Sequence, residues 1–136
     1  MLVYADGSAL SRSVTRDPEA GAWAEWFAAH ADDVVTTPLG VTELRRAADP
    51  LGPAARERAR EVASAVTVVR FFDAALGSAS MASSVLPPFA AIHLGVAMAH
   101  AEVEAIATYD PQLAQVAVLH GMQVLAPGRG PDWWAD

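Results

Sequence analysis

Three carboxylate side chains lie close to the ends of predicted β-strands in this 136-residue chain. Asp6 follows the apolar segment Leu2–Ala5, Glu43 lies on the first turns of a helix after a second strand, and Asp110 follows a fourth strand. Like charges at about 4 Å repel by roughly 4 kcal/mol at an effective dielectric of about 20, so a shared site needs a cation. Mg²⁺ and Mn²⁺ prefer oxygen ligands and can stabilise charge on a phosphate in transfer. The spacing therefore favours a divalent metal site at one sheet edge.

Each of these carboxylates also has a purely structural interpretation. Asp110 precedes Pro111 and is a favourable helix N-cap. Glu43 taken alone is typical of a solvated helix residue, and Asp6 could simply begin an Asp-Gly-Ser turn. Ser8 either caps the following helix or holds a metal-bound water. Only convergence of the three carboxylates would separate the metal site from these alternatives.

Apolar strands that alternate with helices must position these side chains. The expected strands are 2–5, 34–37, 66–70, 105–108 and 122–125, and the expected helices are 19–31, 38–48, 53–64, a helix after Asp73, 87–101 and 111–120. The expected helix caps are Asp17, with Pro18 as the first helical residue, and Asp73. Strands joined by helices form right-handed crossovers and a parallel sheet, whose sites lie at the carboxyl ends of the strands. The predicted fold class is α/β, a three-layer α/β/α sandwich with a short parallel sheet of four or five strands.

The composition excludes several kinds of chemistry. The chain has no cysteine, which excludes disulfides and thiolate sites, and all nine of its positive residues are arginine. The absence of lysine excludes a P-loop and Schiff-base catalysis, and together with Ser8 in place of a second acid it argues against an aspartyl-phosphate fold. The net charge of −7 argues against a generally basic nucleic-acid-binding surface. No apolar run is long enough for a membrane span and no signal peptide is visible, so we expect a cytoplasmic protein.

Four segments, in order along nearly the whole chain, resemble PIN-domain proteins of the VapC toxin type. These segments are Val3–Leu10, Thr42–Ala47, Ala91–Ala97 and Thr108–Asp110, the last followed by Gly121 and Pro127-Gly128. The resemblance implies a PIN-like domain at 1–128 with a short C-terminal tail at 129–136. It also implies a Mg²⁺- (or Mn²⁺-) dependent endoribonuclease toxin that acts on RNA, forms a homodimer and binds a cognate antitoxin protein.

The resemblance further implies roles for individual residues. Asp6, Glu43 and Asp110 match the metal-binding and catalytic carboxylates, and Ser8 and Thr108 match residues that support them. One position departs from the pattern, because the third segment of the family begins with an acidic residue and this chain has Ala90 there. His93 is usual in the family and does not compensate for the missing acid.

The departure at Ala90 leaves two functional interpretations open. The chain is either a ribonuclease toxin scaffold that is inactivated or weakened, or a catalytically dead PIN fold that binds a partner or RNA. Ala90 itself could be an engineered substitution that removes toxicity or a natural loss.

Other residues could contact partners. Arg12, Arg16, Arg45 and Arg46 are candidates to bind RNA phosphates or antitoxin carboxylates, although each could be an ordinary surface charge. A stripe formed by Trp23, Trp26 and Phe27 at helical spacing suits core packing and could also offer a groove to a partner helix. Trp133 and Trp134 either fold back on the domain or reach a partner.

Overall fold

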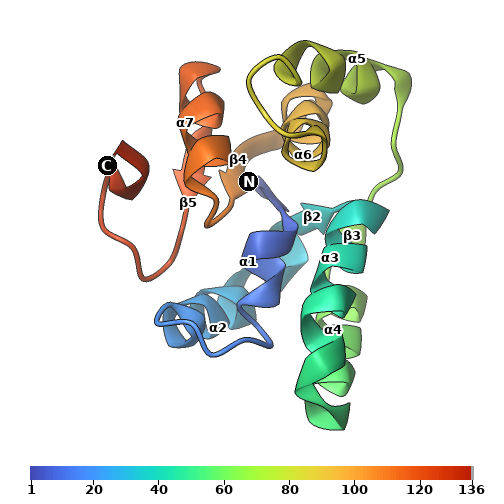
Figure 1. The fold of residues 1–136 in the computed structure, drawn as a ribbon, viewed down its shortest axis with the longest axis vertical. Coiled ribbons are helices and arrows are strands. Elements are labelled where there is room, and N and C mark those ends of the chain that lie inside the picture. The colour runs from blue at the N-terminus through green and yellow to red at the C-terminus, as the bar shows by residue number, and fades with distance from the viewer. Residues whose placement is uncertain (136) are drawn as a thin grey trace.

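A five-stranded, all-parallel sheet forms the centre of the computed structural model, which describes residues 1–135 (Figure 1). The strands are β1 (Leu2–Ala5), β2 (Val34–Thr36), β3 (Thr67–Val68), β4 (Val103–Ala107) and β5 (Gln123–Leu125). Their order across the sheet is β3-β2-β1-β4-β5, so β1 is the central strand. Tyr4 on β1 lies opposite Val35 on β2 and Ile106 on β4. Asp6, which follows β1, is therefore at the middle of the carboxyl edge.

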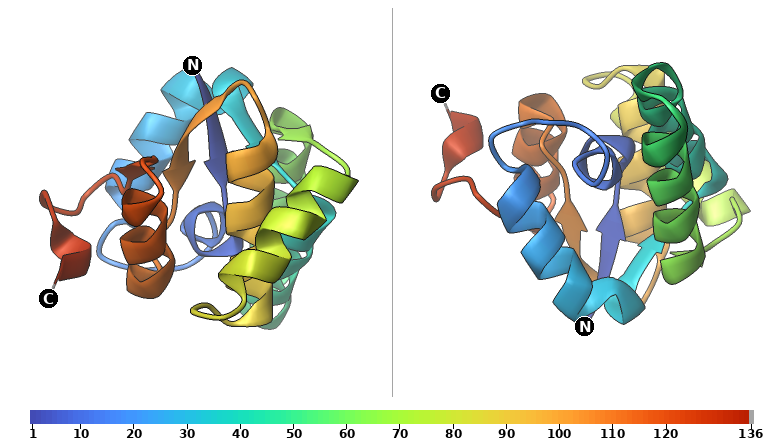
Figure 2. Two further views of the ribbon diagram at one scale, coloured as in Figure 1. Left: turned by 90° about the horizontal axis from the view of Figure 1, so that it is seen from above. Right: turned by 90° about the horizontal axis from the view of Figure 1, so that it is seen from below.

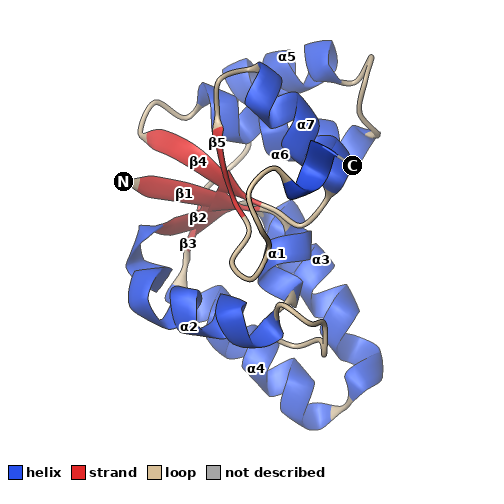
Figure 3. Cartoon of the chain, turned by 90° about the vertical axis from the view of Figure 1, so that its left-hand side faces the viewer, coloured by secondary structure: helices blue, strands red, loops and turns tan. Residues whose placement is uncertain are grey.

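Helices cover both faces of the sheet (Figures 2 and 3). In the described part of the chain they are α1 (Gly7–Ser11), α2 (Ala20–His30), α3 (Pro38–Ala48), α4 (Pro53–Ala65), α5 (Asp73–Ala82), α6 (Pro88–Ala99) and α7 (Pro111–Leu119). Helices α1 to α4 share one buried apolar cluster with the sheet, and α5 to α7 share a second cluster on the opposite face. This arrangement confirms the predicted three-layer α/β/α sandwich with a parallel sheet. No helix within residues 1–135 combines the length and the apolar character that a bilayer span requires.

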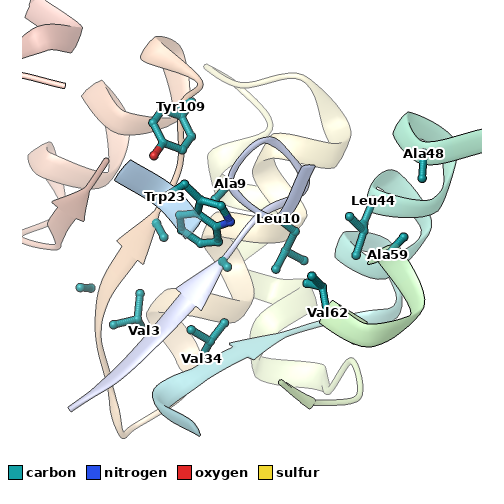
Figure 4. Close-up of a cluster of buried hydrophobic side chains, with 13 residues drawn as sticks. Val3, Ala9, Leu10, Trp23, Val34, Leu44, Ala48, Ala59, Val62 and Tyr109 are labelled. Carbon is teal, nitrogen blue, oxygen red and sulfur yellow. The ribbon is translucent and has the colours of Figure 1, made fainter. Parts of the chain in front are cut away.

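The strand Leu2–Ala5 serves both clusters because successive side chains of a strand point to opposite faces. Val3 and Ala5 belong to the cluster beneath α1 to α4, whereas Tyr4 belongs to the cluster beneath α6. Figure 4 shows the first cluster, in which the fully buried Trp23 packs edge-on against Tyr109 at a centroid distance of 6.4 Å. The tryptophan stripe thus supplies core side chains, as expected.

Two of the predicted helix starts were wrong. Helix α2 begins at Ala20 with Glu19 at its N-cap. Asp17 accepts from the Ala20 backbone through its carbonyl, while its side chain accepts from Thr15 instead of capping the helix. Asp73 is the first residue of α5 rather than its cap, and Phe72 occupies the capping position without a side-chain hydrogen bond. Local capping preference is worth only about 1 kcal/mol and was overridden by tertiary packing.

The strand and helix ends also differ from the expectation in places. The third strand is reduced from 66–70 to Thr67–Val68, because at the sheet edge it pairs only with β2 and both residues are exposed. Strand β4 begins at Val103, two residues earlier than predicted, and α6 ends at Ala99. The short helix α1 was not given a predicted range, and its N-cap is Asp6 rather than Ser8.

The C-terminal tail folds back on the domain as far as Ala135, while Asp136 lies outside the described residues. The Gln115 side chain on α7 donates a hydrogen bond to the Trp134 carbonyl at 2.5 Å, and the Arg129 guanidinium lies 5.1 Å from the Trp133 ring centre. Arg129 also donates to the buried Glu19 carboxylate at 2.7 Å. The tail is therefore joined to the N-terminus of α2.

Replacing Glu19 by Gln is expected to remove a pH-dependent part of the stability. Burial acts to raise the Glu19 pKa, but the hydrogen bond and charge of Arg129, with the charge of Arg12, outweigh it and lower the pKa overall. A lowered folded-state pKa contributes stability that is present above the unfolded pKa of about 4.3 and is lost as the pH falls through the folded value. Urea unfolding should show a loss of about 1.5–3 kcal/mol at pH 7, and a smaller one at pH 3.

Glu57→Gln is the matched control for this measurement. Glu57 pairs with Arg60 at 3.2 Å on the solvated face of α4, where an ion pair is worth at most about 1 kcal/mol. A difference between wild type and Glu19→Gln that does not shrink in acid would show that the Arg129 ion pair is not its source.

Candidate active site at the carboxyl edge of the sheet

Asp6 is held rigidly at the end of the central strand. Its Oδ1 accepts hydrogen bonds from the Ala9 backbone at 2.9 Å and from the Ser8 hydroxyl at 2.7 Å. Its Oδ2 accepts from the Thr108 hydroxyl at 2.6 Å. The residue is only 4% exposed, so its carboxylate has one fixed orientation.

Burial raises the pKa of Asp6, because the charged form loses hydration. The hydrogen bonds from Thr108, Ser8 and Ala9 partly oppose this shift. Within residues 1–135 no arginine forms an ion pair with Asp6. A buried carboxylate of this kind gains most from a cation placed beside it.

Ser8 and Thr108 link the two segments that border Asp6. The Ser8 hydroxyl accepts from the Tyr109 backbone at 2.8 Å, and Thr108 Oγ1 accepts from the Asp110 backbone at 3.1 Å. The two hydroxyls are also 3.2 Å apart. The structure thus brings both predicted supporting residues into contact with Asp6 and ties α1 to the loop before α7.

Asp110 reaches the same edge but acts there as a helix cap. Its Oδ1 accepts from the backbones of Gln112 at 2.9 Å and Leu113 at 3.4 Å, so the structural interpretation of this residue is confirmed. Its connection to Asp6 runs through Thr108, which bonds to both residues. The cap engages one of the two carboxylate oxygens.

Glu43 approaches from α3 and pairs with His93 of α6. Glu43 Oε1 lies against His93 Nε2, and His93 Nδ1 is 2.7 Å from the Tyr4 hydroxyl, which is 3.0 Å from Thr37 Oγ1. His93 is 2% exposed, whereas the Glu43 side chain is 34% exposed. Tyr4 and Thr37 were not predicted as site residues from the sequence. The only signals for them were a polar tip within an apolar strand and a threonine before Pro38.

Ala90 occupies the first turn of α6, one turn before His93. The residue is buried at 9% exposure and belongs to the same apolar cluster as Tyr4 and Leu94. Residues three apart on a helix lie on one face, so position 90 is on the face that carries His93. A methyl group therefore stands where the family pattern has a carboxylate.

The residues present do not make a complete metal site in this arrangement. Among residues 1–135, no three His, Asp or Glu side chains are grouped so that they could hold a metal ion. Both oxygens of Asp6 accept hydrogen bonds, Glu43 is paired with His93, and Asp110 caps α7. These contacts engage both oxygens of Asp6 but only Oε1 of Glu43 and Oδ1 of Asp110, so the ion would compete with protein donors mainly at Asp6.

The four candidate arginines differ in their surroundings. Arg12 is 16% exposed, lies 4.4 Å from the Tyr109 ring centre and donates to the Ser8 carbonyl at 3.2 Å. Its Nε and the Glu19 Oε2 are buried without a hydrogen-bond partner in the described residues. Burial also raises the Tyr109 pKa to about 12, so this ring remains a neutral phenol beneath Arg12. Arg12 therefore packs on Tyr109 and bonds to Ser8, and so supports the segments beside Asp6.

The other three candidate arginines are exposed: Arg16, Arg45 and Arg46. Arg46 lies one turn after Glu43 on α3, and Arg45 lines a hollow of about 300 Å³ between α3 and α4 together with Arg56 and Arg60. The side chains of Arg16, Arg45 and Arg46 are therefore accessible to an anionic partner, whereas Arg12 is not.

Comparison with known proteins agrees with this geometry. The PIN domain family matches residues 3–119, a range that includes all three carboxylates and Ala90. The chain is also similar to Ribonuclease VapC47 of Mycobacterium tuberculosis (strain CDC 1551 / Oshkosh), with 29% identity over 133 residues. That alignment covers 93% of this chain and 98% of the ribonuclease. The chain belongs to the PIN-domain family and is a VapC-type protein.

Proposed function

We propose that this chain is a ribonuclease toxin scaffold of a toxin–antitoxin pair, weakened because Ala90 occupies the fourth acidic position. The observation that carries the proposal is the buried Asp6 carboxylate, fixed by Ser8 and Thr108 at the carboxyl edge of the sheet. A buried carboxylate is costly unless it is hydrogen-bonded and paired with a cation, and Asp6 has the hydrogen bonds but no arginine partner within residues 1–135. The similarity to a VapC ribonuclease over nearly the whole chain favours the same function.

The proposed metal-binding and catalytic residues are Asp6, Glu43 and Asp110, and the proposed ion is Mg²⁺ or Mn²⁺. Oxygen-rich sites of this type suit both ions, which keep several of their waters. Each carboxylate already has a protein partner, and Ala90 supplies no oxygen ligand. We therefore expect the ion to bind weakly. Ser8 and Thr108 would act by holding the Asp6 carboxylate in a fixed orientation through their hydrogen bonds.

The proposed partners are an RNA substrate and a cognate antitoxin protein, in a cytoplasmic homodimer. The exposed Arg16, Arg45 and Arg46 are the candidates for contacts with RNA phosphates or antitoxin carboxylates. Exposed apolar side chains around α5 offer area for protein association: Phe71, Leu76, Met81, Val85 and Phe89.

The alternative function is a catalytically dead PIN fold that binds a partner or RNA. This alternative is favoured by the state of the three carboxylates, each of which is already engaged by the protein. The two functions share the fold and the partners, and they differ in whether RNA is cut.

A cleavage assay separates the two functions. The purified chain is incubated with a structured RNA in Mn²⁺, in Mg²⁺ and in EDTA, beside Asp6→Asn. We expect slow cleavage that requires the metal and falls at least about tenfold in Asp6→Asn, with circular dichroism confirming that the variant is folded. RNA binding without cleavage at any metal concentration would favour the alternative. Cleavage that survives both EDTA and Asp6→Asn would contradict the assigned site.

A further inference from the structure

A row of buried hydrogen-bonding side chains runs from the sheet to Glu43. Thr37 caps α3, and its Oγ1 accepts from the Gly40 backbone at 3.4 Å. Thr37 Oγ1 is 3.0 Å from the Tyr4 hydroxyl, which is 2.7 Å from His93 Nδ1, and His93 Nε2 faces Glu43. Thr37, Tyr4 and His93 are at most 2% exposed, so no bulk water competes for these contacts.

The direction of the hydrogen bonds in this row follows from counting hydrogens. A threonine and a tyrosine hydroxyl each have one hydrogen to donate. Burial strongly raises the Tyr4 pKa, so the phenol keeps its hydrogen. If Thr37 donates to Tyr4, then Tyr4 donates to His93 Nδ1, and the imidazole carries its own hydrogen on Nε2. That hydrogen points at the Glu43 carboxylate, and every hydrogen in the row has an acceptor.

The opposite direction leaves groups unsatisfied. If His93 carried a hydrogen on Nδ1, Tyr4 would have to accept it and donate to Thr37. The Thr37 hydroxyl hydrogen would then have no acceptor among the hydrogen bonds of residues 1–135. In a neutral imidazole, Nε2 would also turn a bare lone pair toward the Glu43 oxygen. A buried donor without a partner loses its hydration and gains no hydrogen bond in exchange. The direction in which Thr37 donates to Tyr4 and Tyr4 donates to His93 is therefore favoured.

The position of Glu43 is limited from the other side by Gly7. A Cβ at position 7 would lie only 2.5 Å from Glu43 Oε1 and 2.7 Å from its Cδ, which is closer than atoms can approach. The carboxylate therefore occupies the space between the α1 backbone and the His93 ring. Because the Glu43 side chain is about one-third exposed, it would be free to turn into solvent without the hydrogen bond from His93.

We infer that His93 is a positioning residue: held by Tyr4 and Thr37 as the neutral tautomer with its hydrogen on Nε2, it orients the Glu43 carboxylate at the sheet edge. The inference rests on the proposed function only for the use of Glu43 as a metal ligand. The tautomer and the orientation are properties of the folded chain itself.

Nitrogen NMR of the chain labelled at histidine tests the tautomer directly. The chain has four histidines, and the spectrum of His93→Gln identifies the His93 signals by their absence. At neutral pH we expect a protonated Nε2 and an unprotonated Nδ1. In Tyr4→Phe, which keeps the buried ring but removes the donor, we expect the His93 signals to move toward a mixture of tautomers. A wild-type signal with hydrogen on Nδ1 alone or on both nitrogens, or no change in Tyr4→Phe, would overturn the inference.

Mn²⁺ binding tests the role of the orientation. The measurement uses electron paramagnetic resonance on Ala90→Asp, alone and combined with His93→Gln or His93→Ala. Loss of a residue that orients a metal ligand costs about 10- to 100-fold in affinity, so we expect that loss with Ala and partial rescue with Gln, which retains a donor. Equal affinity in all three proteins would overturn the positioning role. Failure of Ala90→Asp to bind Mn²⁺ would instead contradict the proposed function and leave the tautomer result standing.

Discussion

An aspartate at position 90 is expected to raise the Mn²⁺ affinity of this chain by tenfold or more and to produce metal-dependent RNA cleavage. The added carboxylate would stand on the His93 face of α6, near the edge that carries Asp6 and Glu43. One further unit charge at about 4 Å from a divalent ion is worth roughly 8 kcal/mol at an effective dielectric of about 20, before dehydration cancels much of it. A net gain of only about 1.4 kcal/mol already gives a tenfold change.

The same substitution is expected to destabilise the chain when no metal is present. Two or three carboxylates at one edge repel each other, although position 90 lies in the first turn of α6, where a negative charge is otherwise favourable. The melting temperature of Ala90→Asp should therefore fall in EDTA. With Mn²⁺ at about 100 times its dissociation constant, binding should return about 2.7 kcal/mol, which corresponds to a rise on the order of 10 °C.

Ala54→Asp is the matched control for this prediction. Ala54 lies in the exposed first turn of α4, so the substitution adds the same charge at the same kind of helix position on another element. It should change neither Mn²⁺ binding nor cleavage. If the chain with Ala90 cleaves RNA as fast as Ala90→Asp does, the fourth position is dispensable and the assignment of the site is wrong.

The parallel sandwich could be predicted from the sequence because its signals are local. Each strand is a short apolar run, and helices such as Pro38–Ala48 begin at a proline and lie between two strands. Asp6 and Thr108 follow neighbouring strands β1 and β4, so the geometry of a parallel sheet alone brings them to one edge. The contact between these residues, which are 102 positions apart, needed no further information.

The remaining features depend on contacts that have no local signal. Glu19 displaced Asp17 from the N-cap of α2 because its carboxylate is held by Arg129, 110 residues away. Arg12 was a candidate for contact with RNA or an antitoxin, yet its side chain is mostly buried and lies against the Tyr109 ring. The pairing of Glu43 with His93 joins α3 and α6, which pack on opposite faces of the sheet, and the sequence pattern of neither helix predicts it. In each case the local sequence allows several possible partners, and only the tertiary fold decides which one is in contact.

Replacing Trp23 by Ala is expected to cost about 3–5 kcal/mol of unfolding free energy, the usual loss for a buried tryptophan. The side chain is fully buried, and its ring packs on those of Trp26 at 5.4 Å, Phe27 at 5.5 Å and Tyr109 at 6.4 Å. Its Nε1 also donates to the Ser13 hydroxyl at 2.8 Å, which would lose this partner. Since small domains are stable by only about 5–15 kcal/mol, this single change removes a large part of the total.

Urea unfolding of Trp23→Ala beside Trp134→Ala measures this effect against a matched loss of the same ring. The Trp134 side chain is only half-buried, and the hydrogen bond at this position uses its backbone carbonyl, which the substitution keeps. We expect Trp134→Ala to cost about 1 kcal/mol or less. A similar loss of unfolding free energy in both variants would contradict the assignment of Trp23 as a main core residue. Because Trp23 supports Tyr109, whose backbone bonds to Ser8 beside Asp6, the loss of Trp23 should also weaken Mn²⁺ binding in the Ala90→Asp background even where that protein remains folded.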